Sequence, residues 1–344
     1  MSRVPSTGST RRVTAAVVAQ RAGVSAATVS LVVNGKAEGR VSAALVARVR
    51  AAVDELGYVV DQSASTLSSG STRTIVMVAP DPSNPYYGSV ISGVKEGLGA
   101  HYQLLLSITE SGRQPDASDI RGIIGLRIAG LLVGAPSPRF LTDLPIPIPT
   151  VLVDSDGTDR SVPSVNLAAA DGARALAEHL AMMGHKRVAY IDNETGSATF
   201  AARREAFWET AARIGLQVVE PAAYATVDTI DAAADAFREC WPAWRRSRAT
   251  AVVCSTDTQA YGVLWEANAL GVRIPDQLAV AGFDDLPYSR VSNPSLTTVA
   301  LPGRELGREA ARALRSLLEG ADVSPRVRTL PAQLIERQST AARF

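Results

Sequence analysis

Polar and aromatic side chains follow several apolar runs in the second, larger part of the chain, and their types are those that bind small molecules. Asp81 to Tyr87 follow one run, and Asp192 to Arg203 follow another. Thr256 and Asp257 follow a third run, and Asp284 lies at the end of a fourth. Carboxylates accept hydrogen bonds, guanidinium groups donate them in a fixed fork, and aromatic faces stack on a sugar or a base. These residue types predict a binding site for a hydroxyl-rich ligand.

The apolar runs predict the elements that position these side chains. Helical patterns separate the runs and cover residues 90–99, 171–184, 201–215 and 257–271. Alternating strands and helices predict parallel sheets with helices on both faces, and ligands bind beyond the carboxyl ends of such strands. The chain is too long for one such domain, so we expect two α/β lobes with a cleft between them. The predicted strands cover 74–80, 103–108, 129–134, 150–154, 187–192, 250–255 and 278–285.

Residues 13–58 have a different pattern, with three short helical segments. Thr14 is placed to cap the first helix, whose apolar face carries Val18, Ala19 and Ala22. Gly23 follows, as is typical where a helix ends in left-handed geometry. Two short helices joined by a glycine turn are the layout of a helix-turn-helix, although the same layout occurs in domains that never bind DNA.

The second helical segment has two distinct sides. Ser25 is placed to cap it, and Val29, Val32 and Val33 form the side expected to be buried. The opposite side is expected to lie against the DNA major groove. Its residues are Ala26, Ala27, Ser30, Leu31 and Asn34. Further candidates for DNA contact are the two capping residues Thr14 and Ser25 and the neighbouring Thr28, Lys36 and Arg40.

The charge distribution favours DNA binding by this head. Residues 1–72 carry eight Lys and Arg against four Asp and Glu, a net charge of +4, while the whole chain carries +1. A basic head on a slightly acidic body is typical of a protein whose head contacts phosphates. An ordinary solvated surface would also tolerate this charge, so the charge supports the helix-turn-helix interpretation without proving it.

Several segments, in order along nearly the whole chain, are similar to one known family. In the head these are VAQRAGVSAATVSLVVNG (18–35) and ELGY (55–58). In the body they are DPSNPYY (81–87), MGHKRVAYI (183–191), STDTQAYG (255–262), VAGFDDLPYS (280–289) and NPSLTTV (293–299). The chain resembles the lactose-repressor/purine-repressor family of bacterial transcription regulators.

The resemblance implies roles for residues in the head and the segment after it. It assigns contact with base edges to Ala26, Ala27 and Leu31, which are apolar here and suit the thymine methyl group rather than hydrogen bonds to guanine or adenine. It implies that the Ser-rich segment 61–73, which alone resembles a flexible linker, is a hinge that becomes helical on operator DNA. Leu67 then matches the residue wedged into the minor groove, and Ala64 matches a small residue one turn before it.

The resemblance also implies effector-binding roles in the body. Tyr86 and Tyr87 match aromatics that flank the ligand, and Arg203 and Asp284 match residues that bind its polar groups. Ser197 stands where the purine-type member has an arginine, which favours a sugar over a charged purine. The remaining candidates are Thr199, which matches a ligand-facing threonine, Thr256, which replaces a common asparagine, and Asp257 beside it.

Patterns of catalysis and metal binding are not found in the sequence. Cys240 and Cys254 lack metal-ligand spacing, and His101, His179 and His185 are scattered. No nucleophile elbow, P-loop or dinucleotide-binding glycine motif follows a predicted strand. A signal peptide and a long apolar run are also missing. We therefore expect a cytoplasmic protein that is not an enzyme and has no cofactor, metal or membrane partner.

Together these patterns predict a domain order. We expect a disordered arm over 1–12, a helix-turn-helix head over 13–60 and a hinge over 61–73. The core is expected to have two doubly wound, parallel-sheet lobes of periplasmic-binding-protein type. The N-terminal lobe is predicted to comprise 74–163 and 295–325, and the C-terminal lobe 164–294 and 326–340.

The leading functional interpretation is a homodimeric, sequence-specific transcriptional regulator, and most simply a repressor. Its partners are then a near-palindromic double-stranded operator, because a two-fold dimer presents two matching helices, and a small-molecule effector, with a sugar favoured. The alternative is a cytosolic or periplasmic-type sugar-binding carrier without a gene-regulatory role.

Overall fold

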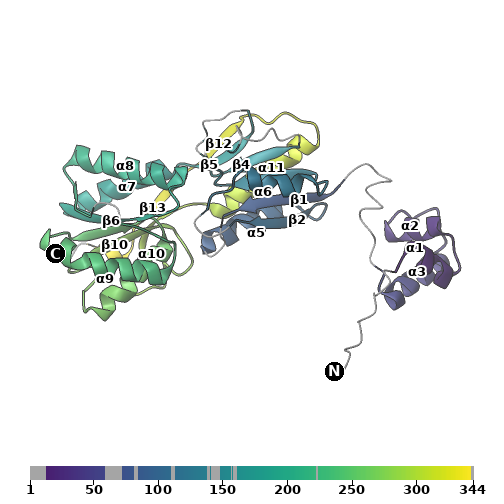
Figure 1. Ribbon diagram of the computed structural model, residues 1–344, viewed down its shortest axis with the longest axis horizontal. Coiled ribbons are helices and arrows are strands. Elements are labelled where there is room, and N and C mark those ends of the chain that lie inside the picture. Colours follow the sequence, from purple (N-terminus) through teal and green to yellow (C-terminus); the bar gives the residue numbers. More distant parts are fainter. Residues whose placement is uncertain are drawn as a thin grey trace, which may run out of the picture. The chain divides into compact units, whose positions relative to one another are not determined.

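The structure is a computed structural model, and it divides the chain into two compact units, 1–72 and 73–344 (Figure 1). It describes residues 13–58, 72–80, 84–109, 113–137, 140, 148–155, 157, 161–221 and 224–341. The predicted arm over 1–12, most of the predicted hinge, and with it Ala64 and Leu67, lie outside the described residues.

The head unit contains three helices around a small apolar core. Helix α1 spans Ala15–Ala22, α2 spans Ala26–Val33 and α3 spans Ala43–Leu56. Val18, Val29 and Val49, one from each helix, are fully buried and pack together. The predicted faces of the first two helices are confirmed at Val18, Ala19, Ala22, Val29 and Val32, whereas Val33 is only half-buried.

Two features hold the turn between α1 and α2. Gly23 ends α1 with φ of 61°, which glycine adopts without the strain that a side chain would bring. The Arg48 guanidinium of α3 donates to the carbonyl oxygens of Ala22 and Gly23, which the end of α1 leaves without helical partners. The predicted cap at the start of α1 is wrong, since the exposed Thr14 side chain makes no capping hydrogen bond.

The N-terminal lobe of the core unit is a six-stranded parallel sheet. Helices α5 (Pro85–Leu98) and α11 (Gly303–Leu318) cover one face, where they pack on Ile75 and Met77. Helix α6 (Ala117–Ile124) covers the other face, over Val76 and Val78. The strand order is β12 (Val327–Leu330), β5 (Ser164–Leu167), β4 (Thr150–Val153), β3 (Gly130–Gly134), β1 (Thr74–Ala79) and β2 (Gln103–Ile108).

The C-terminal lobe is a second doubly wound sheet (Figure 1). Helices α7 (Ala169–Met182) and α8 (Ala198–Ile214) cover one face, and α9 (Ile230–Arg246) and α10 (Asp257–Ala269) cover the other. All pairs are parallel except β11 with β13. The strand order is β13 (Gln333–Ile335), β11 (Thr297–Ala300), β10 (Ala279–Asp284), β9 (Ala251–Cys254), β6 (Arg187–Asn193) and β7 (Gln217–Val218), with β8 (Tyr224–Thr226) also on β6.

The predicted fold class is therefore confirmed, but the predicted lobe boundaries differ from the strand pairing. Strand β5 belongs to the N-terminal sheet, β11 to the C-terminal sheet and β12 to the N-terminal sheet. The chain thus crosses between lobes a few residues later than the predicted boundaries at 163, 294 and 325. Hydrogen-bonded pairing with a neighbour decides which sheet a short strand joins, and the apolar pattern of the strand alone does not carry that information.

No single helix in the described part of the chain is both long and apolar enough to cross a membrane. Helices α1 and α2 meet that test only when they are taken together, by length and composition, and they are bent by 102° at their junction.

Candidate functional site

A cavity of about 90 Å³ lies between the two lobes of the core. Its walls come from both sheets, at the carboxyl ends of β1, β4, β6 and β10. The predicted effector residues that line it are Tyr86, Tyr87, Ser197, Thr199, Arg203 and Asp284. Asn84, Arg113, Asp154, Asn193, Phe200 and Asp228 line it as well.

The start of α5 forms the N-terminal-lobe wall. Asn84 caps this helix, since its Oδ1 accepts a 2.8 Å hydrogen bond from the Tyr86 backbone N–H, and Pro85 takes the first helical position. The helix therefore begins at 85 rather than at the predicted 90, and Tyr86 and Tyr87 lie in its first turn. Their rings meet edge to face, with centroids 5.7 Å apart, and form an aromatic wall.

Arg203 and Asp284 form the centre of the C-terminal-lobe wall. Arg203 is 3 % exposed, donates from Nη1 to the Ser255 carbonyl oxygen at 2.8 Å and approaches Asp284 Oδ1 at 3.7 Å. The rings of Phe200 and Phe283 flank its guanidinium. These contacts fix the arginine in one orientation beside a buried carboxylate, as polar recognition of a ligand requires.

Burial dominates the electrostatics of the cleft. It raises the pKa of Asp284 and of Asp154, while the positive charge of Arg203 lowers both. Burial also raises the pKa of Tyr86 and Tyr87, so both phenols stay neutral donors at physiological pH. Within the described residues, the buried Tyr86 hydroxyl and Arg203 Nε have no hydrogen-bond partner. The cleft therefore offers carboxylate acceptors together with two donors for a ligand.

Ser197 and Thr199 lie at the start of α8, the element that carries Arg203. Ser197 caps the helix through a hydrogen bond from the Phe200 N–H. Thr199 donates across the cleft to Asp154 Oδ1 at 3.4 Å. Both side chains line the cavity, but Ser197 also has this structural role, which is a sufficient reason for its residue type.

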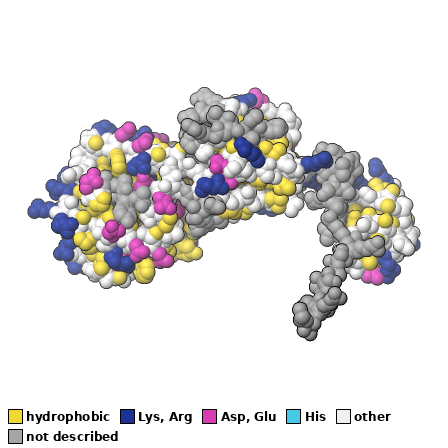
Figure 2. All heavy atoms as spheres, in the orientation of Figure 1, with side chains coloured by type: hydrophobic (Ala, Val, Ile, Leu, Met, Phe, Trp, Pro, Cys, Tyr) yellow, Lys and Arg dark blue, Asp and Glu magenta, His cyan; other side chains and the backbone are white. Residues whose placement is uncertain are grey.

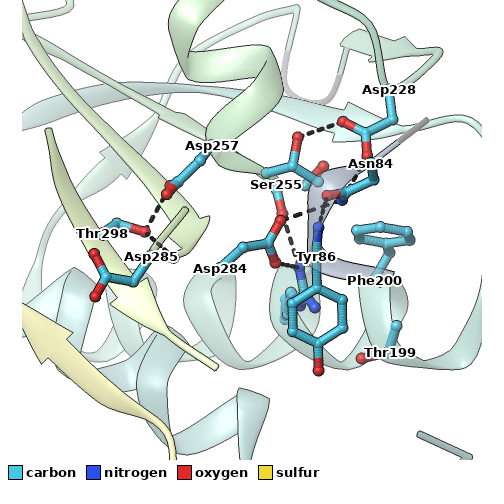
Figure 3. A network of polar contacts seen from close by, with 12 residues as sticks. Asn84, Tyr86, Thr199, Phe200, Asp228, Ser255, Asp257, Asp284, Asp285 and Thr298 are labelled. Carbon is cyan, nitrogen blue, oxygen red and sulfur yellow. Dashed lines mark hydrogen bonds and ion pairs between the residues drawn. The ribbon is translucent and has the colours of Figure 1, made fainter. Parts of the chain in front are cut away.

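Thr256 and Asp257, the two other predicted effector residues, do not line the cavity. Thr256 is fully buried, caps α10 and donates to Asp228 Oδ1 at 2.5 Å, so it contacts the cleft through Asp228. Asp257 lies in a separate buried network, where it accepts a hydrogen bond from the Thr298 hydroxyl at 2.6 Å (Figure 3) and another from the Leu286 N–H at 2.9 Å. Its geometry favours a structural role in holding the loop after β10.

The buried Asp257 predicts a pH dependence of stability. Burial raises its pKa from an ordinary 3.8 to about 7. The folded state therefore holds a proton that the unfolded state releases between about pH 4 and 7, and stability falls as the pH rises through this window. We expect unfolding free energy to fall by about 1 kcal/mol per pH unit there, relative to Asp257→Asn, which cannot titrate. Urea unfolding at several pH values measures both proteins, and a pH-independent difference would contradict the assignment.

Other lining residues were missed by sequence reasoning. Asp154 ends a predicted strand, and Asn84, Asn193 and Phe200 lie in the segments that follow predicted strands, so a signal existed for each. Asp228 had none, because it follows β8, which is only three residues long.

The second candidate site is the outer face of α2. Ala26, Ala27 and Ser30 are exposed, and Leu31 is half-buried. The predicted Ser25 cap is present, since its hydroxyl oxygen accepts from the Thr28 N–H at 3.2 Å. Among the other candidates, Thr28 is half-buried, and Lys36 and Arg40 are exposed in the loop before α3.

Asn34 has a contact that sequence reasoning did not anticipate. Its Nδ2 donates to the Ser30 carbonyl oxygen at 2.8 Å and to the Ser30 hydroxyl at 3.2 Å, at the end of α2. The amide thus caps its own helix in this structure. Most of the exposed α2 face is then methyl groups, a surface that suits thymine methyls rather than bidentate hydrogen bonds.

The described residues contain no group of three or more His, Cys, Asp or Glu side chains that could hold a metal ion.

Comparison with known proteins gives matches for both parts of the chain. Residues 16–61 match the family described as bacterial regulatory proteins, lacI family, and residues 177–340 match the periplasmic binding protein-like domain. The HTH-type transcriptional repressor CytR of Escherichia coli (strain K12) is 29 % identical over 333 residues, which cover 94 % of this chain and 95 % of that protein.

Two solved structures have the same fold. The lac repressor dimer bound to operator and an anti-inducer gives a TM-score of 0.80 at 23 % identity, over 96 % of this chain and 100 % of the other. The complex of the transcriptional regulator CelR with cellobiose gives 0.68 at 27 % identity, over 95 % and 100 %. The similarity thus covers the head and both lobes.

Proposed function

The chain belongs to the lactose-repressor/purine-repressor family of bacterial transcription regulators, and on that premise we propose that it is a transcriptional repressor controlled by an effector in the interlobe cleft. The observation that carries the proposal is the combination of two sites in one chain. The head exposes the face of a capped α2 helix, and the core encloses a cleft with Arg203 beside Asp284. DNA binding and ligand binding are therefore available to the same molecule.

The proposed DNA partner is a near-palindromic operator bound by a homodimer. The relative with operator bound is a dimer, and a two-fold dimer presents its α2 helices to matching half-sites. Binding of the effector favours one arrangement of the lobes over the other, and the difference in affinity for the two arrangements is what controls DNA binding.

The proposed effector is a neutral, hydroxyl-rich small molecule, most simply a sugar. Asp154, Asp228 and Asp284 supply acceptors for hydroxyl groups, and Tyr86 and Phe200 supply faces for a ring. An effector with a phosphate group would face these carboxylates at close range, which is unfavourable. The relative CelR was solved with cellobiose, which supports a sugar.

The proposed place of action is the cytoplasm, where the operator DNA is, and we propose no enzymatic activity. The relative CytR is a transcriptional repressor, and the contacts of Arg203 with Ser255 and of Thr256 with Asp228 hold cleft side chains in place.

Removal of residues 1–72 tests the proposal. A thermal-shift screen on the full chain identifies a sugar that raises its melting temperature. The same sugar should also raise the melting temperature of the fragment 73–344, because a ligand that binds the native state stabilises that state. The fragment should lose binding to DNA fragments selected with the full chain. A sugar-binding carrier predicts instead that the full chain selects no specific DNA, and this outcome would refute the repressor proposal.

The hinge gives a separate prediction. Leu67 lies outside the described residues, and the proposal assigns it the minor-groove wedge of the family. Leu67→Ala is expected to reduce DNA bending and weaken specific binding about tenfold or more, because unstacking a base step needs an apolar wedge. Fluorescence energy transfer between the ends of an operator duplex measures the bend, and an unchanged bend would remove the assignment.

A further inference from the structure

The side chain of Asn84 joins the two lobes across the cleft. Its Nδ2 donates to Asp228 Oδ2 at 2.8 Å and approaches Asp284 Oδ2 at 3.3 Å, while its Oδ1 caps α5 (Figure 3). Asn84 comes from the N-terminal lobe, and both carboxylates come from the C-terminal lobe. We propose that Asn84 is a positioning residue that latches the lobes in the closed arrangement and holds both carboxylates for the effector.

The surroundings of Asn84 favour a primary amide at this position. Asn84 is 8 % exposed and Asp284 is 5 % exposed, so the hydrogen bond between them is shielded from water, while Asp228 is half-buried. One short side chain must supply an acceptor to the Tyr86 N–H and donors to two carboxylates. Among side chains of this length, only asparagine provides both.

The acceptor on the other side is held in place as well. Asp228 Oδ1 accepts a 2.5 Å hydrogen bond from the Thr256 hydroxyl, which leaves Oδ2 directed to Asn84. This gives buried Thr256 a function at the cleft, because it orients the carboxylate that receives the latch. The other described hydrogen bond across the cleft, from Thr199 to Asp154, is longer at 3.4 Å.

The latch predicts how closure and ligand binding are coupled, and this step rests on the proposed function. Each carboxylate has lone pairs beyond those that Asn84 uses, so ligand hydroxyls can bind to acceptors that are already oriented. Preorganised acceptors lower the entropic cost of binding. Loss of the latch should therefore favour the open arrangement first and weaken effector binding as a consequence.

Asn84→Asp separates the latch from the helix cap. Aspartate has nearly the same shape and caps helices as well as asparagine does, so a role in capping alone predicts no loss. The latch predicts the opposite, because a carboxylate at 84 would face Asp228 and Asp284. Asn84→Ser is the matched control, since serine keeps a capping oxygen but has no amide NH₂ to reach Asp228 and Asp284 and adds no negative charge.

A charge-swapped pair provides the second test. In Asp228→Asn alone, the new amide oxygen at 228 would accept from the Thr256 hydroxyl. The amide nitrogen at 228 would then face the Asn84 amide nitrogen across the cleft, and neither can accept a hydrogen bond. In the double variant Asn84→Asp with Asp228→Asn, the amide at 228 donates to the carboxylate at 84. The hydrogen bond is then rebuilt in the reverse direction, with Asp284 still close to the new carboxylate.

Double electron–electron resonance on the full chain, without effector or DNA, measures closure directly. Spin labels at the exposed positions of Arg121→Cys and Glu209→Cys report the distance between the lobes, and excess unlabelled chain suppresses distances between protomers. The native Cys240 and Cys254 are buried. We expect a longer and broader distance distribution in Asn84→Asp, a smaller change in Asn84→Ser, and a return toward wild type in the double variant.

A wild-type distribution in Asn84→Asp overturns the latch, and so does a double variant that is no closer to wild type than Asn84→Asp or Asp228→Asn. If Asn84→Asp does not fold, a folded and closed double variant still supports the latch. Because no effector or operator is present, these outcomes do not depend on whether the proposed regulatory function is correct.

Discussion

Asp284→Asn is expected to abolish the response of operator binding to the effector while operator binding itself remains. The Asp284 carboxylate is buried in the cleft, 3.7 Å from the Arg203 Nη1 and 3.3 Å from the Asn84 Nδ2. Asparagine has the same size but replaces one acceptor with a donor, which would face the donors of Arg203 or Asn84. We expect a loss of about 3 kcal/mol, or roughly 100-fold in effector affinity.

Fluorescence anisotropy of a labelled operator, titrated with the sugar from the thermal-shift screen, measures this effect. Asp322→Asn is the matched control, because the Asp322 side chain is 82 % exposed and its ion pair with Arg326 is solvated. An effector response of normal size in Asp284→Asn would show that the effector does not bind at this wall of the cleft.

Arg203→Ala should abolish the response too, but at a cost in stability. The guanidinium is the cation that lowers the pKa of both Asp154 and Asp284, and its removal leaves two buried carboxylates without it. Breaking a buried charged pair costs about 3–5 kcal/mol. The unfolding free energy is therefore expected to be highest in wild type, lower in Asp284→Asn and lowest in Arg203→Ala. Urea unfolding can measure this order.

Gly93→Ala is expected to destabilise the core strongly although it adds one methyl group. Helices α5 and α11 cross with their backbones in contact, and a Cβ at Gly93 would lie 1.9 Å from the Arg304 carbonyl oxygen. Gly307 has the reciprocal contact, with a Cβ position 2.0 Å from the Val90 carbonyl oxygen. Backbone atoms cannot rotate away, so the two helices must separate, at a cost of about 3 kcal/mol or more.

Gly88→Ala in the same helix is the control. Nothing lies within 4 Å of its Cβ position, so alanine should stabilise the helix by about 0.5–1 kcal/mol through its higher helix propensity. Thermal unfolding of both variants gives the contrast. Equal melting temperatures for Gly93→Ala and wild type would show that the two helices do not cross this closely.

Most of the core fold could be predicted from sequence because its longer strands are continuous apolar runs, which are buried in β1, β3, β6 and β9 and largely exposed in the edge strand β2. Strands β1, β2, β3, β6 and β9 were placed to within about two residues, since continuous apolar runs between polar segments mark such strands. The short β5, β7, β8 and β12 were missed. Strands β7 and β8 have only two and three residues, and polar side chains interrupt the four-residue β5 and β12, unlike the four apolar residues of β9. Helix α11 was missed although its pattern is strongly amphipathic.

The cleft was predictable in part, for a physical reason. Strand ends bring residues together in α/β sheets, and this rule located Tyr86, Tyr87, Arg203 and Asp284 together with the resemblance. The rule does not distinguish a side chain that points into the cleft from one that points behind the strand. Asp257 is the example, since it begins a helix after β9 but faces Leu286 and Thr298.

On the face of the core that Figure 2 shows, positive and negative side chains are mixed with scattered apolar ones. The net charge of the chain is small, +1, because interspersed Arg, Asp and Glu side chains balance one another, and not because charged side chains are scarce. Such a surface gives little help to sequence reasoning, because a functional arginine and a solvated one look alike until their burial is known.

Because the chain crosses repeatedly between the lobes, the order of its synthesis on the ribosome affects when each part can fold. Neither sheet is complete until the last part of the chain has been made, since β12 completes one at Leu330 and β13 completes the other at Ile335. The head, by contrast, has its whole apolar core within residues 13–58. A nascent chain can therefore fold its DNA-reading head while the sensor is still unfinished, and a chain cut short before Val327 keeps the reader but has neither sheet complete.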